Sequence, residues 1–337
     1  MIYVIVSFNE GAYDFSSVIP DLLSHKEVFV KRIICIVSAL ALSSFTHKAI
    51  ASNELCLAST NDCTFVLLST KVSEKTSELV NQITSARTRK EGGSLDEAKV
   101  VKASSYVEEI EKLLLVNEKR AKRRLSPFST FKITNSLIAL DSKQITNAQQ
   151  TLTFDQEKYP VQAWWPSVWK LPEYNLATAF KFSMVAIYRQ MATGIGQEKM
   201  QSYVLSFDYG NKDISSGLDS FWLNGSLKIS AIEQVRFLQK MHRGQLAISQ
   251  SSIDTLKEVM LVETNAHYSL YAKTGAGKAN ADDKSSKAML GWYVGFVENT
   301  EGVHYFAFNF TRDSYAQMKA SRVIIARNHL KQAGIIK

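Results

Sequence analysis

Residues 126–140, Ser-Pro-Phe-Ser-Thr-Phe-Lys-Ile-Thr-Asn-Ser-Leu-Ile-Ala-Leu, predict a turn that runs into a buried helix. Proline is favoured at a helix start, and apolar residues such as Phe131 and Leu137 supply a face that can be buried. Ser129 and Lys132 are three positions apart, so they share one face of that helix. A hydroxyl beside a lysine in apolar surroundings suits an activated nucleophile, because such surroundings favour the neutral amine. An ordinary amphipathic helix could carry the same pair, so the rest of the chain decides.

The composition is that of an ordinary globular protein. The chain has 337 residues, of which 45% are hydrophobic and 21% charged, enough for one large or two small domains. Part of the net charge of +8 comes from a basic run at 119–124. No nucleic-acid motif or interleaved aromatic residues accompany this run, so we expect a solvated helix end and no nucleic-acid partner. The histidines show no metal-ligand spacing, and we expect no metal site and no bound cofactor.

The N-terminal region predicts an export signal. Lys31 and Arg32 precede the apolar run Ile33–Leu42, and Ala49-Ile50-Ala51 follows it. A positive segment, a short apolar segment and an A-x-A site describe a secretory signal peptide. We therefore predict a signal peptide over residues 1–51, with the residues before about 26 an over-long gene start, and export to the periplasm without stable membrane association after cleavage. The alternative is a single uncleaved anchor.

Two cysteines remain after the predicted cleavage before Ser52. An exported protein permits a disulfide between Cys56 and Cys63, and two free buried thiols are the alternative. We predict one domain over residues 52–337, interrupted by a polar insertion at about 71–118. Within that insertion Tyr106, Ile110 and two leucines recur at helical spacing and predict an amphipathic helix.

The remaining segments predict an α+β fold. Strands near both ends of the chain, with helices between them, indicate a central antiparallel sheet built from both termini and an inserted all-helical lobe. The expected elements are a strand at 63–68, a packed tryptophan-rich loop at 164–169, helices at 177–191, 229–238 and 314–333, a turn at 207–213, a strand at 268–277 ending in a glycine turn, and a hairpin at 290–310.

Four spaced motifs carry a family resemblance. They are S-T-F-K at Ser129–Lys132, S-M-V at Ser183–Val185, Y-G-N at Tyr209–Asn211 and K-T-G at Lys273–Gly275. In this order and at these intervals they resemble the motif set of the class D serine β-lactamases, the oxacillinases. Three departures from the family pattern are the long charged insertion, Thr134 in place of a common proline and a small residue, Ala276, after K-T-G.

Other residues extend the resemblance. Trp222 and Leu223 resemble the family's lysine-shielding pair, Trp292–Gly295 is similar to its W-x-x-G strand, and Arg322 falls where the family has an arginine that binds the substrate carboxylate. The resemblance implies the serine β-lactamase and penicillin-binding-protein fold. It covers the chain from Thr64 onward except the insertion.

The resemblance also implies a mechanism. Ser129 would attack a β-lactam, and Lys132, carbamylated by CO2 to N6-carboxylysine, would be the general base for acylation and deacylation. Ser183 would relay a proton, and the backbone N–H groups of Ser129 and Ala276 would form the oxyanion hole. The other implied site residues are the carboxylate-binding Lys273 and Arg322, the K-T-G residues Thr274 and Gly275, the pocket residues Phe131, Val185, Trp222 and Leu223, and the wall residues Tyr209 and Asn211.

The function expected from this resemblance is hydrolysis of β-lactam antibiotics by a monomer or homodimer. The alternatives are a sensor or a penicillin-binding protein that is acylated by β-lactams and remains so.

Overall fold

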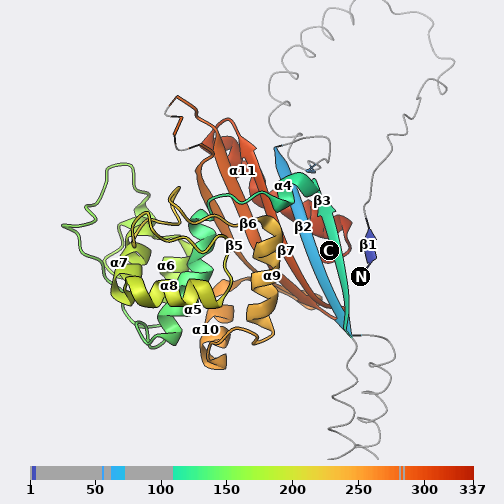
Figure 1. Cartoon of the computed structure of the whole chain (residues 1–337), viewed down its shortest axis with the longest axis horizontal. Helices are drawn as coiled ribbons and strands as arrows, with labels where there is room; N and C mark the ends of the chain where they lie inside the picture. Colours follow the sequence, from blue (N-terminus) through green and yellow to red (C-terminus); the bar gives the residue numbers. More distant parts are fainter. Residues whose placement is uncertain (1, 5–54, 57–61, 73–108, 281, 284) are drawn as a thin grey trace, which may run out of the picture.

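A seven-stranded sheet forms the centre of the molecule (Figure 1). The computed structural model describes residues 2–4, 55–56, 62–72, 109–280, 282–283 and 285–337. The strands lie in the order β1 (Ile2–Val4), β3 (Glu109–Val116), β2 (Cys63–Val72), β7 (Gly302–Arg312), β6 (Met289–Asn299), β5 (Tyr268–Lys278) and β4 (Leu261–Thr264). All neighbours pair antiparallel except β1 and β3. The sheet therefore combines strands from both ends of the chain, as predicted.

The helices lie between β3 and β4 in the sequence, with one more at the C-terminus. They are α4 (Glu118–Lys122), α5 (Phe131–Asp141), α6 (Leu176–Lys181), α7 (Val185–Ile195), α8 (Gln197–Ser206), α9 (Ala231–His242), α10 (Gln250–Met260) and α11 (Tyr315–Gln332). The described residues also form two short 3₁₀ turns, η1 (Phe128–Thr130) and η2 (Ser167–Trp169). The α+β architecture with an inserted helical lobe is confirmed.

Two apolar cores cover the two faces of the sheet. The larger core joins one face to the helical lobe and includes Phe131 from α5 and Val235 from α9. The smaller core joins the other face to α11 through Met318 and Ile325. Figure 1 shows α9 and α11 on opposite sides of the strands. The nucleophile-bearing segment predicted from the sequence therefore lies where the helical lobe meets the sheet.

The helix predicted inside the insertion is wrong. Residues 109–116 form strand β3, which pairs with β2 so that Leu114 faces Leu67 across the ladder. Leu113 packs against the larger core and Leu114 against the smaller one. This alternation is the two-residue period of a strand, hidden in the sequence by consecutive leucines. Tyr106 and the rest of the insertion lie outside the described residues.

The single helix predicted over 177–191 is also wrong, because the chain breaks it at Ser183. Helix α6 ends at Lys181, and α7 begins at Val185. Ser183 has a φ of 58°, in the left-handed region that interrupts a helix. The serine thus lies in a helix break and not within an apolar helix.

The glycine turn predicted at the end of the strand over 268–277 is replaced by continuous strand. Strand β5 runs through Gly275 and Gly277 to Lys278 and pairs with β6 over its whole length. The glycines serve close packing instead: a Cβ on Gly275 would lie 2.9 Å from the carbonyl oxygen of Pro127.

Other expectations have mixed outcomes. The hairpin of β6 and β7 and the C-terminal helix, capped by Ser314, are confirmed. In the tryptophan-rich loop Trp165 is buried, whereas Trp164 is 71% exposed. The basic run is only partly a solvated helix end, because Arg120 is buried and donates to Asn309 and Thr311.

The disulfide alternative for the two cysteines is confirmed, since Cys56 and Cys63 are bonded. The predicted signal peptide lies outside the described residues except for Ile2–Val4, which form β1. None of the described helices has both the length and the apolar character needed to cross a membrane.

Candidate active site

The entry to α5 presents Ser129 beside Lys132. Ser129 lies in η1 and is partly accessible, while Lys132 lies in the first turn of α5 and is 1% exposed. The Nζ of Lys132 donates to the Oγ of Ser129 over 3.2 Å. This is hydrogen-bond distance between a serine hydroxyl and an amine that could accept its proton once neutral.

The surroundings of Lys132 favour the neutral amine. Its Nζ lies 4.7 Å from the centre of the Tyr188 ring, which α7 contributes and which is itself fully buried. Burial lowers the pKa of Lys132 to about 7, because the interior solvates the ammonium poorly. A substantial fraction of the amine is therefore neutral near physiological pH.

Aromatic rings pack around Phe131, the residue before Lys132 in the sequence. Trp222 stacks on Phe131 with 5.5 Å between ring centres, and Phe221 packs edge-on against both. The carbonyl oxygen of Trp222 accepts a 3.0 Å hydrogen bond from the N–H of Phe128, next to Ser129. The indole Nε1 of Trp222 is buried and has no hydrogen-bond partner among the described residues. An unpaired buried donor is costly, so this indole is suited to an acceptor that binds there.

A second serine–lysine pair lies nearby. The Nζ of Lys273 on β5 donates to the Oγ of Ser183 over 2.8 Å and to the carbonyl oxygen of Thr274 over 3.0 Å. Burial lowers the pKa of Lys273 well below its usual value, and the charges of Lys132 and Arg322 lower it further. Because a charge shifts a pKa only over a short distance, these two effects indicate that Lys132, Lys273 and Arg322 lie near one another.

Arg322 reaches this group from α11 on the other face of the sheet. Its Nη1 donates to the carbonyl oxygen of Gly275 over 3.1 Å, whereas its buried Nε has no partner within the part of the chain that the structure describes. The K-T-G strand thus carries the amine of Lys273 and is contacted by the guanidinium of Arg322. A guanidinium beside an amine that regains its proton next to an anion suits a carboxylate.

Comparisons with known proteins agree with this arrangement. The model of the penicillin binding protein transpeptidase domain matches residues 72–331. β-Lactamase OXA-48 of Klebsiella pneumoniae is 39% identical over 223 residues, which cover 65% of this chain and 78% of that protein. The crystal structure of FUS-1 (OXA-85), a class D β-lactamase from Fusobacterium nucleatum subsp. polymorphum, superposes with a TM-score of 0.63 at 27% identity, covering 82% of this chain and 94% of that one. The chain belongs to the class D serine β-lactamases.

A regulatory protein also matches this chain. Regulatory protein BlaR1 of Bacillus licheniformis is 31% identical over 224 residues, which cover 66% of this chain and 35% of that protein. The class D framework is therefore shared by proteins named as β-lactamases and by one named as a regulator.

The remaining class D motif residues lie around the same centre. Val185 is the first residue of α7, two positions after Ser183, and Leu223 follows Trp222; both are half-buried. Thr274 and Ala276 lie on either side of Gly275 in β5 and are also half-buried. Each of the four lies within two positions of a residue that takes part in the contacts above.

The two Y-G-N residues expected to form a wall support the site from behind. Tyr209 is fully buried and packs edge-on against Phe131 with 5.6 Å between ring centres. The side chain of Asn211 donates to the carbonyl oxygen of Ser226 and accepts from the N–H of Lys228. Asn211 thus holds the loop that carries Trp222, and the role of both residues in shaping the wall of the site stays a prediction.

Sequence reasoning missed three residues that shape the class D site. Tyr188 lies beside Lys132, Phe128 precedes Ser129 with a φ of 50°, and Lys228 donates to the hydroxyl of Ser126 at 2.6 Å. Tyr188 lies three positions after Val185 of the S-M-V motif on the same helix, so helical spacing from that motif could have suggested it. No local signal in the sequence pointed to the other two.

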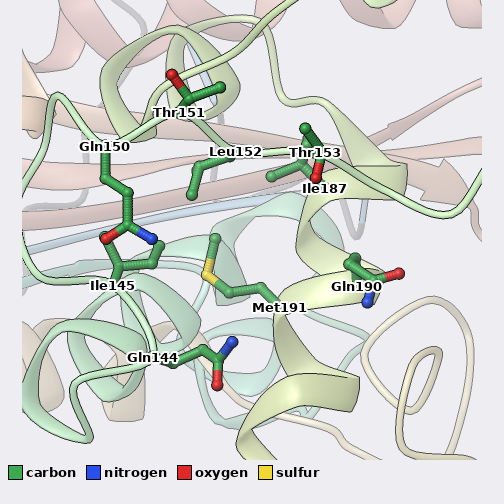
Figure 2. A pocket seen from close by; sticks show the side chains of 9 residues that line it. All are labelled: Gln144, Ile145, Gln150, Thr151, Leu152, Thr153, Ile187, Gln190 and Met191. Atoms are coloured by element: carbon green, nitrogen blue, oxygen red, sulfur yellow. The ribbon is translucent and has the colours of Figure 1, made fainter.

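A separate cavity of about 230 Å³ lies beside α7 and contains none of the motif residues (Figure 2). Figure 2 shows the side chains that line it, which carry no formal charge: Gln144, Ile145, Gln150, Thr151, Leu152, Thr153, Ile187, Gln190 and Met191. A cavity without a cation does not suit an anionic substrate. The described residues also contain no group of His, Cys, Asp and Glu side chains that could hold a metal ion.

Proposed function

We propose that this protein hydrolyses β-lactams through an acyl-enzyme on Ser129. The proposal rests chiefly on one observation, the 3.2 Å contact between Ser129 Oγ and a buried Lys132 whose pKa is about 7. Oγ gives up its proton and forms a bond to the lactam carbonyl carbon, and the ring C–N bond breaks. Water then cleaves the resulting ester and frees Ser129.

The pocket around Lys132 fits a carbamate. A neutral amine is the form that takes up CO2, and burial keeps this amine largely neutral. The unpaired Nε1 of Trp222 supplies a donor for a carbamate oxygen, and the stacked Phe131 and Trp222 exclude water. A carbamate on Lys132 would supply the general base for acylation and deacylation. The CO2 or bicarbonate of the medium would be its source.

Ser183 and Lys273 are placed to protonate the leaving nitrogen. Lys273 donates to Ser183 Oγ, so the Ser183 hydroxyl proton is free to point toward the substrate. When Ser183 donates that proton, Lys273 can replace it. Arg322 keeps its positive charge while Ser183 and Lys273 transfer protons, and it binds the substrate carboxylate. An anion beside Lys273 would also raise the pKa of this lysine again, because opposite charges favour the charged form.

The oxyanion hole would use the N–H groups of Ser129 and Ala276. Ser129 follows the turn at Pro127, and Ala276 lies in β5 between two glycines that let the strand approach this turn. Each such donor contributes on the order of 3 kcal/mol to transition-state stabilisation in serine hydrolases. The two N–H groups come from separate segments, and together they would donate hydrogen bonds to the developing oxyanion.

Turnover of a chromogenic cephalosporin tests the proposal. Purified protein is expected to hydrolyse many equivalents, faster with added bicarbonate. The match to BlaR1 supports a second candidate, a β-lactam sensor that stays acylated. Mass spectrometry separates the two: one stable acyl adduct per chain without turnover would favour the sensor, whereas return to the free mass after substrate exhaustion supports the hydrolase.

We also propose that the protein acts after export to the periplasm. The bonded Cys56 and Cys63 support this, because disulfides persist in oxidising compartments. The matches to β-lactamases agree with an exported protein. Signal cleavage at residue 51 and a monomeric or homodimeric state remain predictions, to be checked by N-terminal sequencing of the secreted protein and by light scattering.

A further inference from the structure

Phe128 combines three unusual features. It precedes the nucleophile, its φ is 50°, and its side chain is 3% exposed. A bulky residue with positive φ is a backbone outlier that persists only where its surroundings hold it. Phe128 is therefore held in an unfavourable conformation at the entry to α5.

Two contacts hold Phe128 in place. Its N–H donates to the carbonyl oxygen of Trp222 over 3.0 Å. Its ring lies over the backbone of Gly277, because a Cβ built on Gly277 would overlap the Phe128 ring. The space that a side chain at position 277 would occupy is thus filled by Phe128.

This contact lies between the two donors of the proposed oxyanion hole. Ser129 follows Phe128, and Ala276 precedes Gly277, so each partner of the contact is covalently next to one donor. The neighbouring approach of Gly275 to the carbonyl oxygen of Pro127 shows that the two segments pack backbone against backbone. The Phe128 ring is therefore part of the contact between η1 and β5.

We infer that Phe128 and Gly277 are a matched pair that positions the two oxyanion-hole donors of this protein. This inference rests on the proposed acyl-enzyme function and adds positioning residues that do not touch the substrate. The ring of Phe128 spaces the N–H groups of Ser129 and Ala276, and the absence of a side chain at Gly277 makes the room. A misplaced donor costs catalysis because the donors must lie where the negative charge develops.

The test compares kcat/KM for a chromogenic cephalosporin with the affinity for an arylboronic acid, which forms a tetrahedral adduct on serine. Phe128→Leu and Gly277→Ala are each expected to lower both quantities by on the order of tenfold to hundredfold, the range for oxyanion-hole defects. The bicarbonate dependence is expected to stay as in the wild type. In the Phe128→Ala background, Gly277→Ala is expected to cause little further loss, because the ring that it displaces is gone.

Phe310→Leu is the matched control. Phe310 is fully buried and fills the space over Gly291 in the same way, but it belongs to the core on the α11 face. It is expected to lower the melting temperature and keep kcat/KM within about twofold. Equal losses of kcat/KM in Phe310→Leu and Phe128→Leu, or unchanged boronic acid affinity in folded Phe128→Leu and Gly277→Ala, would overturn the inference. Absence of turnover in the wild type would refute the proposed function instead, and boronic acid affinities would still test the pair.

Discussion

The Nζ of Lys132 lies 4.7 Å from the centre of the Tyr188 ring, and this contact joins α5 to α7 at the base of the site. The hydroxyl of Tyr188 is hydrogen-bonded to Ser136 Oγ at 2.8 Å, one turn further along α5. The Tyr188 side chain thus contacts Lys132 through the face of its ring and Ser136 through its hydroxyl. The ring covers one side of the amine with an apolar surface, which agrees with the lowering of the Lys132 pKa by burial.

The first prediction concerns Lys132 and pH. Its pKa is lowered from 10.5 to about 7, so the neutral fraction rises as pH increases through 7. Bicarbonate activation of turnover is therefore expected to grow from pH 6 to pH 8, where the neutral amine rises from roughly a tenth to nine tenths. Lys132→Ala is expected to abolish turnover at every pH, as measured with a chromogenic cephalosporin. Full activity in that variant would end the argument for a base at this position.

The second prediction concerns stability at the same residue. Between pH 7 and 10.5 the unfolded chain binds the Lys132 proton and the folded protein does not, so the free energy of unfolding is expected to rise with pH in this window. Lys132→Met has no titrating group at this position, so this source of pH dependence in the free energy of unfolding is absent. In bicarbonate-free buffer at pH 7 it is expected to be more stable than the wild type by about 1–3 kcal/mol. Added bicarbonate is expected to raise the melting temperature of the wild type alone. Equal shifts in both proteins would argue against a carbamate on Lys132.

Much of the site could be predicted because its residues lie in short motifs. The spacing in S-T-F-K placed Ser129 and Lys132 on one helical face, and the structure puts them in contact. The hairpin of β6 and β7 could be predicted for a similar reason, since its turn and its apolar strands are adjacent in sequence. Local patterns are reliable where neighbours in the chain are also neighbours in space.

The misses involve contacts between distant segments. The helical pattern of 177–191 continues across Ser183, and the break there serves a contact with Lys273, 90 residues later. Strand β3 can be recognised only from its pairing with β2, because its consecutive leucines hide the alternation in the sequence. Phe128 likewise depends on Gly277 in β5, and neither residue signals the other within a local window. Tertiary packing decides these three features and overrides the local preference.

The third prediction separates two roles of Trp222, its packing and its Nε1–H. Trp222→Phe keeps a ring to stack on Phe131 but removes the unpaired donor. It is expected to leave acylation within a few-fold of wild type, to slow deacylation by on the order of tenfold and to raise the bicarbonate requirement. Trp222→Ala is expected to do the same more strongly and to cost about 3–5 kcal/mol of stability. Stopped-flow acylation and steady-state deacylation rates give the comparison, and unchanged rates in Trp222→Phe would contradict the donor's role.

The fourth prediction concerns carboxylate binding by Arg322. Arg322→Ala is expected to raise KM by about tenfold to hundredfold for substrates that carry the carboxylate and to change kcat less, because a binding contact common to ground and transition state is lost. Arg327→Ala is the matched control, since Arg327 lies on the same helix and pairs with Glu263 away from Gly275. Esterified substrates provide a second readout, because they lack the anion and are expected to be insensitive to Arg322→Ala. Equal effects on the acid and the ester would contradict the assignment.

The fifth prediction returns to Tyr188. Tyr188→Phe keeps the ring beside Lys132 and removes only the hydroxyl that bonds Ser136, so it is expected to cost about 1 kcal/mol of stability and to leave bicarbonate activation unchanged. Tyr188→Leu removes the ring, and water can then reach the amine and raise its pKa toward the ordinary value. The pH at which bicarbonate activation is half-maximal is therefore expected to move upward in Tyr188→Leu and to stay in place in Tyr188→Phe. A common midpoint in both variants would show that the ring does not set the protonation of Lys132.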